Sequence, residues 1–134
     1  MSEAIVAVVC TISAIVLLTT IFLYFFPIVQ IAGYSMFPTL LDGELYLGRR
    51  VFRKTKCKVG EIYVYRPPYD SDEERFVIKR LSHIEKDQSG RIKYYFLGDN
   101  SNDSYDSRYY GLVDSSRVVA HIVAKKRGVS NEGL

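Results

Sequence analysis

The first part of the chain differs from the rest in its pattern of hydrophobic and polar positions. Residues 4–26 contain neither a charged residue nor a proline. At about 1.5 Å per residue, a helix over this run would span the roughly 30 Å hydrocarbon core of a bilayer. The pattern therefore predicts a transmembrane helix. Pro27 is expected to end it, because proline cannot donate the backbone hydrogen bond that would continue a helix.

Two other interpretations of this run fit less well. A cleavable signal peptide usually has a basic start and an apolar region of about 7–15 residues, whereas this chain begins Met-Ser-Glu. A buried core helix is also less favoured, because a body of about 100 residues could hardly cover a helix that is apolar on every side. If the run is an anchor, only residues 27–34 separate it from Ser35. The serine then stays within roughly 25–30 Å of the membrane.

After Phe26 the pattern changes to short alternating runs bounded by Gly, Pro, Asn and Asp, which is typical of strands and turns. A Gln-Ser-Gly sequence at 88–90 lies between two such runs and predicts a hairpin. No later segment has a sustained helical period. We therefore expect a mainly β fold, in which one N-terminal transmembrane helix precedes a compact antiparallel β domain. The expected strands cover residues 44–47, 61–65, 76–81, 91–97 and 118–124.

These patterns divide the chain into three parts. We expect an anchor over residues 1–27, a β-rich domain over 28–124 and a polar tail over 125–134 that frays. All 18 Lys and Arg residues lie at or beyond Arg49. The resulting positive charge of the domain is too mild for a nucleic-acid binder, so no nucleic-acid partner is expected.

Two polar stretches interrupt the predicted strands. Residues 49–58 hold six basic side chains in ten, and residues 70–74 form a short acidic run. Both are typical of solvated loops or hairpin tips. The basic run has a second interpretation, contact with anionic lipid headgroups, because the domain must sit close to the membrane.

Cysteine and histidine suggest no chemistry of their own. Cys10 lies in the hydrophobic segment and Cys57 in the basic stretch, so neither a disulfide nor a metal-ligand spacing is expected. His83 and His121 are single residues within strand-like runs, and we expect both to be half-buried strand residues.

Ser35 and Lys79 are the candidates for chemistry. Ser35 lies in a Gly/Pro-bounded turn at 33–39, where a serine is more often structural than catalytic. Lys79 lies in an apolar strand, where burial disfavours the ammonium form and lowers the lysine pKa toward neutrality. A neutral lysine could accept the proton of a serine hydroxyl. By the two-residue period of a strand, either Lys79 or Arg80 must face outward.

A third polar stretch, residues 98–111, is rich in Gly, Asn, Asp and Ser and predicts a loop. A calcium loop of the usual twelve-residue type would need a central glycine and a terminal glutamate, and neither is present. We therefore expect no metal and no cofactor.

Together, three motifs resemble the type I signal peptidases, the membrane-anchored Ser-Lys leader peptidases of the peptidase S26 family. They are Gly-x-Ser-Met-x-Pro-Thr at 33–39, Ile-Lys-Arg at 78–80, and Gly-Asp-Asn followed by Ser-x-Asp-Ser-Arg-x-x-Gly at 98–111. The resemblance covers nearly the whole chain in the family's order. It implies a signal-peptidase-like fold and a membrane-bound serine endopeptidase that removes signal peptides from translocated preproteins.

The resemblance also implies roles for individual residues. Ser35 matches the nucleophile and Lys79 the general base. Met36 matches the methionine that helps to wall off the site, and Ser104 matches the serine that hydrogen-bonds the lysine amine. The polar framework of the site corresponds to Asp99, Asp106 and Arg108, with an ion pair expected between the last two.

The sequence departs from the family pattern in three places. Some members have a serine two residues before the nucleophile as a side-chain oxyanion donor, and here that position is Gly33. The oxyanion hole would then depend on the Ser35 backbone N–H and on water or another backbone donor. The family's turn after Lys79 and Arg80 is altered, and the large extra β domain of some members is absent.

The expected partners are preproteins with signal peptides and the lipid bilayer, and the sequence names no partner subunit. Two locations fit the resemblance: the plasma membrane with the domain on the extracytoplasmic side, or the mitochondrial inner membrane facing the intermembrane space. Two alternatives to the peptidase remain. One is a catalytically silent relative that binds peptides or partners, and the other is a self-cleaving Ser-Lys regulator of related fold.

Overall fold

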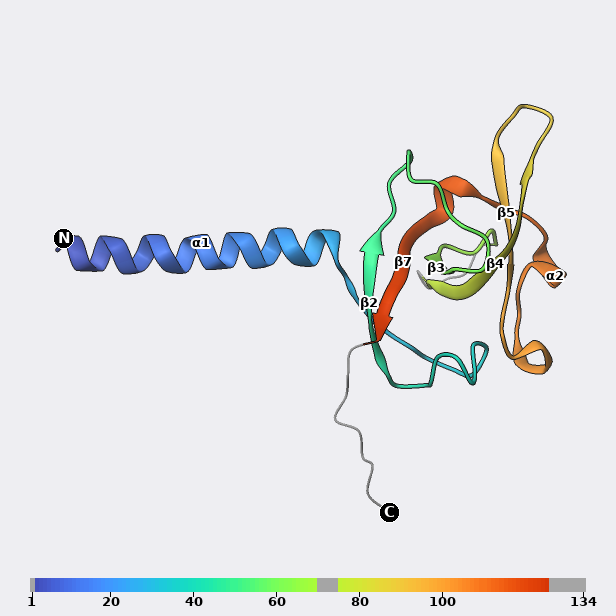
Figure 1. The fold of residues 1–134 in the computed structure, drawn as a ribbon, viewed down its shortest axis with the longest axis horizontal. Coiled ribbons are helices and arrows are strands. Elements are labelled where there is room, and N and C mark those ends of the chain that lie inside the picture. Colours follow the sequence, from blue (N-terminus) through green and yellow to red (C-terminus); the bar gives the residue numbers. More distant parts are fainter. Residues whose placement is uncertain (1, 70–74, 126–134) are drawn as a thin grey trace, which may run out of the picture.

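The computed structural model describes residues 2–69 and 75–125. One long helix, α1 (Glu3–Phe25), projects from a body built around a single sheet (Figure 1). No residue of α1 is buried, and it is the one helix in the described part of the chain that is long and apolar enough to cross a membrane. The helix predicted from the uncharged run is therefore present, and its length and composition fit a membrane span.

The body is one antiparallel sheet of seven strands in the order β1-β2-β7-β3-β4-β5-β6. This confirms the mainly β prediction. The strands are β1 (Ile28–Gln30), β2 (Leu45–Arg50), β3 (Ile62–Tyr65), β4 (Val77–Lys86), β5 (Ile92–Leu97), β6 (Val113–Asp114) and β7 (Val118–Lys125). The connection from β5 to β7 also contains the short helix α2 (Ser107–Tyr110) and the 3-10 turns η1 (Ser101–Asp103) and η2 (Ser115–Arg117).

The structure adds elements that the sequence pattern did not indicate. The strands β1 and β6 have three and two residues, too few for an alternating pattern to be visible. The strand β4 continues to Lys86 instead of ending near residue 81, because its second half pairs with β5 beyond a bulge between Leu81 and His83. His83 there stacks on Tyr95, with ring centroids 4.5 Å apart.

Some segments and side chains differ from the sequence predictions, and others lie outside the described residues. The strand β7 reaches Lys125, the expected first residue of the polar tail. The rest of that tail and the acidic run 70–74 lie outside the described residues. His121 is partly buried as expected, whereas the side chain of His83 is 47% exposed.

The sheet buries two hydrophobic clusters. The first is centred on Tyr65, Leu81 and Phe96, each fully buried, and the rings of Tyr65 and Phe96 stack 4.2 Å apart. The Tyr65 hydroxyl is hydrogen-bonded to the Tyr110 hydroxyl, and burial raises the Tyr65 pKa so that this phenol stays neutral. The first cluster thus holds the central strands together, and the buried Tyr65 hydroxyl within it has a hydrogen-bond partner.

The second cluster lies where the chain passes from β1 into β2. Its buried members are Ile31, Met36, Leu40, Tyr46 and Ile62. Three of these belong to the segment around Ser35, so hydrophobic burial fastens that segment to the sheet. The position of Ser35 is therefore set by the burial of the residues that flank it in sequence.

Replacement of Phe96 by alanine should destabilise the body strongly. The phenyl ring is fully buried and stacked on Tyr65, so Phe96→Ala leaves a cavity. We expect the free energy of unfolding in urea, measured in detergent, to fall by about 3–5 kcal/mol. The matched control is Phe76→Ala, because Phe76 is 54% exposed and should change stability by less than about 1 kcal/mol. Equal losses in the two variants would contradict this description of the core.

Candidate active site

The loop that carries Ser35 is closed by backbone and side-chain hydrogen bonds at its base. The Ile31 N–H donates to the Glu44 carbonyl at 2.9 Å, and the Gly43 N–H donates to the Ile31 carbonyl at 2.8 Å. The Gly33 N–H donates to Asp42 Oδ1 at 2.8 Å. These bonds give residues 31–44 a defined path between β1 and β2. We call this segment the serine loop.

Lys79 reaches the serine loop from β4. It pairs across the sheet with Tyr63 of β3 and shares a face with Leu81, so its side chain points into the body and is only 5% exposed. Its Nζ lies 2.6 Å from Ser35 Oγ, within hydrogen-bond distance. Arg80 faces the other way, with its side chain 35% exposed. The predicted choice between the two basic residues is therefore settled, with Lys79 inside.

The environment of Lys79 shifts its protonation equilibrium toward the neutral amine. Desolvation lowers the Lys79 pKa to about 8, against the opposing effect of the Asp106 carboxylate, which raises it. About a tenth of the molecules then carry a neutral amine at pH 7. In the ammonium form Nζ donates to Ser35 Oγ, whereas the neutral amine can accept the hydroxyl proton and turn Oγ into a nucleophile.

The strand-end motif Gly-Asp-Asn at 98–100 holds the serine loop from the opposite side. The Asn100 N–H donates to the Ser35 carbonyl at 2.9 Å, and its side-chain amide donates to the Tyr34 carbonyl at 3.0 Å. Asp99 Oδ2 accepts from the Thr39 hydroxyl at 2.6 Å. Asp99 and Asn100, two consecutive residues after β5, therefore hold the serine loop before and after Ser35.

Arg80 connects β4 to the same motif. Its Nε and Nη2 donate to the two carboxylate oxygens of Asp99 at 2.8 and 2.6 Å, and its Nη1 donates to the Gly60 carbonyl at 2.6 Å. The hydrogen bond from Arg80 lowers the Asp99 pKa, which keeps the carboxylate charged. The paired guanidinium thus ties the strand that carries Lys79 to the loop that holds Ser35.

Position 98 must be glycine because there is no room for a side chain. A Cβ on Gly98 would lie 2.1 Å from Ser104 Oγ and 2.7 Å from the Ser35 carbonyl oxygen. Any side chain would push the serine loop and the Ser104 segment apart. The close approach of these three backbone segments is the geometric basis of the site.

Asp106 organises the rest of the polar stretch 98–111. Its carboxylate is fully buried and accepts from the Gly98 N–H at 2.9 Å and from Ser104 Oγ at 2.7 Å. Arg108 Nε donates to it at 2.9 Å, so the predicted ion pair is present. Desolvation raises the Asp106 pKa, but the hydrogen bonds from Arg108, Gly98 and Ser104 outweigh it and bring the pKa to about 2.

Met36 and Ser104 are both buried, but the hydrogen bond that the resemblance implies for Ser104 is absent from the described part of the chain. Met36 is buried at 2% exposure beside Ser35 in sequence and forms part of the second cluster. The Ser104 hydroxyl donates to Asp106, and among the described residues it has no hydrogen bond to Lys79. The expected contact between Ser104 and the lysine amine is therefore not made in this structure, in which the Ser104 hydroxyl proton is directed to the Asp106 carboxylate.

Gly33 has a local reason to be glycine. Its φ of +94° lies in a region that side-chain-bearing residues rarely adopt, and its N–H is taken by Asp42. A serine there would be strained in this backbone conformation. The Ser35 N–H, in contrast, forms no hydrogen bond within the described residues and remains available as a donor.

Sequence reasoning assigned no role to Asp42, Arg80, Gly98 or Asn100. Three of them were visible as members of the quoted motifs, but a motif does not show which partner each member contacts. Asp42 lies in an Asp-Gly pair before β2, and its bond to Gly33 depends on how the loop closes. His83 and His121 pair with Glu85 and Glu61 and have no described contact with Ser35.

Removal of the buried amine should stabilise the folded chain. Unfolded lysine has a pKa near 10.5 and Lys79 in the fold about 8, so the unfolded chain binds more protons between these pH values. Below pH 8 the folded chain carries the full cost of burying the Lys79 ammonium, about 3 kcal/mol. The hydrogen bond to Ser35 offsets about 1 kcal/mol of this cost. We expect Lys79→Met to raise the free energy of unfolding by about 1–3 kcal/mol at pH 7, with the gain shrinking above pH 8.

Urea unfolding in detergent from pH 6 to pH 10 measures this difference. Lys86→Met, at an exposed strand end, is the control and should show no such pH-dependent gain. A Lys79→Met variant less stable than the wild type at pH 7 would contradict the inferred desolvation of the amine.

The comparisons with known proteins agree with this geometry. The profile of the family described as "Signal peptidase, peptidase S26" matches residues 3–88 and 88–125, which include α1, the serine loop, β4 with Lys79, and the polar stretch 98–111. A search among curated protein sequences found no match. Because the profile covers most of the chain, and the fold is the antiparallel one expected of the family, this chain belongs to the peptidase S26 family of signal peptidases.

Proposed function

We propose that this protein is a membrane-bound serine endopeptidase that removes N-terminal signal peptides from translocated preproteins through a Ser-Lys dyad. Family membership indicates signal-peptidase activity. The observation that carries the proposed mechanism is the 2.6 Å distance between Lys79 Nζ and Ser35 Oγ, with the lysine buried and its pKa lowered to about 8. A nucleophile within hydrogen-bond distance of a base is the arrangement that acyl transfer requires.

The proposed reaction has two halves. Neutral Lys79 takes the Ser35 proton while Oγ attacks the scissile carbonyl carbon, and the tetrahedral intermediate forms. When the C–N bond breaks, the Lys79 ammonium gives that proton to the leaving amine, which leaves an ester on Ser35. Lys79 then removes a proton from water, the hydroxide attacks the ester carbon, and Oγ leaves with the proton from Lys79.

The Ser35 N–H is the proposed donor to the oxyanion. It is free of protein partners within the described residues, and the Asn100 N–H bond to the Ser35 carbonyl holds that residue's backbone in place. A preorganised donor of this kind contributes on the order of 10²–10³ in rate. Gly33 supplies no side-chain donor, so water or another backbone N–H completes the hole in this proposal.

The proposed substrate and location are supported by the family and by α1. The preprotein would lie extended against a strand edge, with small residues one and three positions before the cut, as in related enzymes. A helix of this length and composition would tether the enzyme in the bilayer that also holds its substrates, which raises their effective concentration. The proposed location is the plasma membrane, with the β domain on the extracytoplasmic side. The alternative is the mitochondrial inner membrane, with the domain facing the intermembrane space.

Cleavage of a preprotein with an Ala-x-Ala site tests the proposal directly. With the purified full chain in detergent, we expect wild-type cleavage at that site. Ser35→Ala and Lys79→Ala should each reduce the rate by at least about 10³, because the nucleophile and its base act as a unit. Ser116→Ala, an exposed serine remote in sequence from the dyad, is the control and should cleave normally. No cleavage by the wild type would favour the catalytically silent relative, and undiminished cleavage by Ser35→Ala would exclude Ser35 as the nucleophile.

The pH dependence of cleavage should report Lys79. Because the neutral amine is the reactive form, kcat/KM should rise with pH and level off above an apparent pKa of about 8. Asp106 raises the Lys79 pKa, so Asp106→Asn should move the midpoint to lower pH in whatever fraction stays folded. Initial rates from pH 6 to pH 10 measure both profiles. A flat profile, or a midpoint near 10.5, would exclude Lys79 as a desolvated base.

A further inference from the structure

The joint between α1 and the sheet is built by residues at the end of β2. Arg50 Nε donates to the Tyr24 carbonyl at 2.7 Å, and the guanidinium carbon lies 4.4 Å from the centre of the Tyr24 ring. Phe52 packs on Phe25, with ring centroids 5.9 Å apart. The last turn of α1 is therefore held by a cation at its carbonyl end and by an aromatic contact. Figure 1 shows β2 running across the direction of α1, with its end beside the end of the helix.

The basic loop, residues 49–58, starts at this joint. Beyond Arg50 the chain makes a tight turn in which the Thr55 N–H donates to the Phe52 carbonyl at 2.8 Å and the Phe52 N–H donates to Thr55 Oγ1 at 3.1 Å. At its other end the loop is anchored by the buried Cys57 and by the Lys58 N–H bond to the Tyr63 hydroxyl at 2.8 Å. The loop thus has a defined shape and is pinned at both ends.

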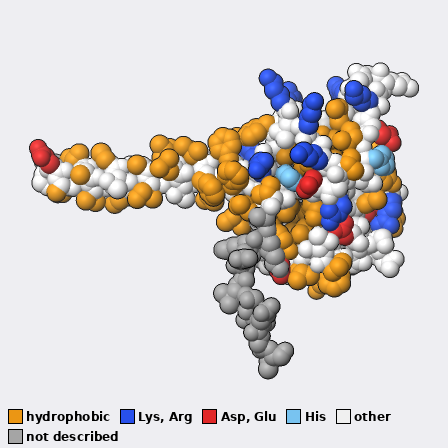
Figure 2. Space-filling view, in the orientation of Figure 1, with side chains coloured by type: hydrophobic (Ala, Val, Ile, Leu, Met, Phe, Trp, Pro, Cys, Tyr) orange, Lys and Arg blue, Asp and Glu red, His pale blue; other side chains and the backbone are white. Residues whose placement is uncertain are grey.

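The side chains of this loop form an unneutralised positive surface. It has six basic residues in ten, and no Asp or Glu occurs between residues 45 and 60. Arg53, Lys54 and Lys56 are exposed, and within residues 2–69 and 75–125 none of them has an ion-pair partner. Figure 2 shows several Lys and Arg side chains projecting from the top of the body and beside its junction with α1, with others spread over the visible face.

The basic loop lies beside the end of α1, a placement that a merely solvated loop would not require. Burial of Cys57 and the Phe52 contact with Phe25 place the cationic tip beside the position where α1 would leave the hydrocarbon core. In an anionic bilayer that level is occupied by phosphate groups, and each Lys or Arg near such a surface is attracted to it. The charge and the place of the loop therefore fit the same partner.

We propose that the basic loop docks on the headgroups of anionic phospholipids in the membrane that α1 crosses. This rests on the membrane anchoring included in the proposed function. Because the loop continues from β2, which pairs with β1, docking would hold the sheet and the attached serine loop at a fixed height above the bilayer. A single helix alone permits the body to tilt, whereas a second point of contact restricts it.

Tryptophan fluorescence can test this, because the natural chain contains no tryptophan. The variant Phe52→Trp, the loop probe, reports the position of the basic loop. The variant Ile12→Trp, the helix probe, reports insertion of α1, because residue 12 lies in the middle of that helix. Each full-length variant is reconstituted in vesicles of phosphatidylcholine brominated near the headgroup end or near the end of its acyl chains, with or without phosphatidylglycerol. Bromine quenches tryptophan on contact.

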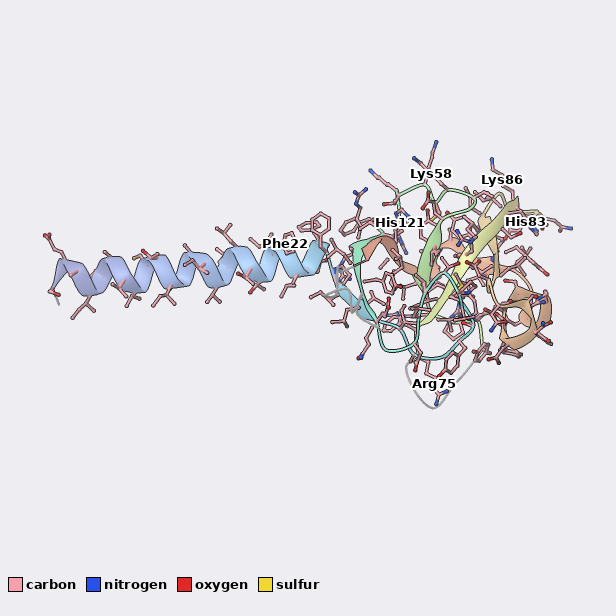
Figure 3. The ribbon with its side chains drawn as sticks, turned by 60° about the horizontal axis from the view of Figure 1, so that its bottom comes forward. Phe22, Lys58, Arg75, His83, Lys86 and His121 are labelled. Atoms are coloured by element: carbon pink, nitrogen blue, oxygen red, sulfur yellow. The ribbon has the colours of Figure 1, made fainter. Side chains whose placement is uncertain are left out.

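We expect the helix probe to be quenched by the deep label in both kinds of vesicle. The loop probe should be quenched by the shallow label at least about twofold more when phosphatidylglycerol is present, and high salt should remove the difference. Adding Lys54→Gln and Lys56→Gln to the loop probe should abolish the anionic-lipid effect. The matched control adds Lys86→Gln and Arg91→Gln, which remove the same charge at the far end of the body, where Figure 3 places Lys86 away from Phe22. It should keep the effect.

Other outcomes separate this proposal from the proposed function. If the helix probe is quenched but the loop probe responds equally to neutral and anionic vesicles, the helix spans the bilayer and the lipid-docking proposal is wrong. A loop probe that no lipid quenches leaves the loop free for an acidic protein partner and also overturns it. If the helix probe is not quenched in any vesicle, membrane anchoring itself fails. Cleavage of a detergent-soluble preprotein remains a separate test of the dyad.

Discussion

Burial of one amine underlies the candidate active site. Lys79 is placed on the core face of β4, where solvent is excluded and the ammonium form loses its hydration. The same desolvation that weakens the fold lowers the pKa to about 8 and makes the lysine a usable base. Stability and chemistry are thus opposed at a single residue, as is common where a site needs a group in an unfavourable state.

The remaining polar network keeps this arrangement in register. Asp99 joins Arg80 to the serine loop, Asn100 holds the Ser35 backbone, and Asp106 holds the loop that follows. Each carboxylate is charged and fully paired, so the network satisfies its own buried atoms and leaves Lys79 in an environment that disfavours its charge. Asp106 limits that effect, because its charge stabilises the ammonium.

The site is also positioned with respect to α1. The serine loop follows β1, which directly follows the helix, and Arg50 of the neighbouring strand β2 binds a carbonyl in the last helical turn. The sheet and the helix end therefore form one connected unit. Under the proposed function, the height and tilt of this unit above the membrane would determine which peptide bonds of a substrate reach Ser35. The basic loop at the joint is suited to control that orientation.

Local patterns in the amino-acid sequence were enough to predict the apolar helix, the β-rich body, most of its strands and the candidates Ser35 and Lys79. These predictions need periodicity and motifs but no knowledge of contacts. The folded chain was needed to show that Lys79 rather than Arg80 faces inward, that Ser104 bonds Asp106, and that Asp42 occupies the Gly33 N–H. It also showed that Cys57, which lies in a basic stretch, is buried. Such facts depend on strand pairing and loop closure between residues distant in sequence, and no local pattern encodes them.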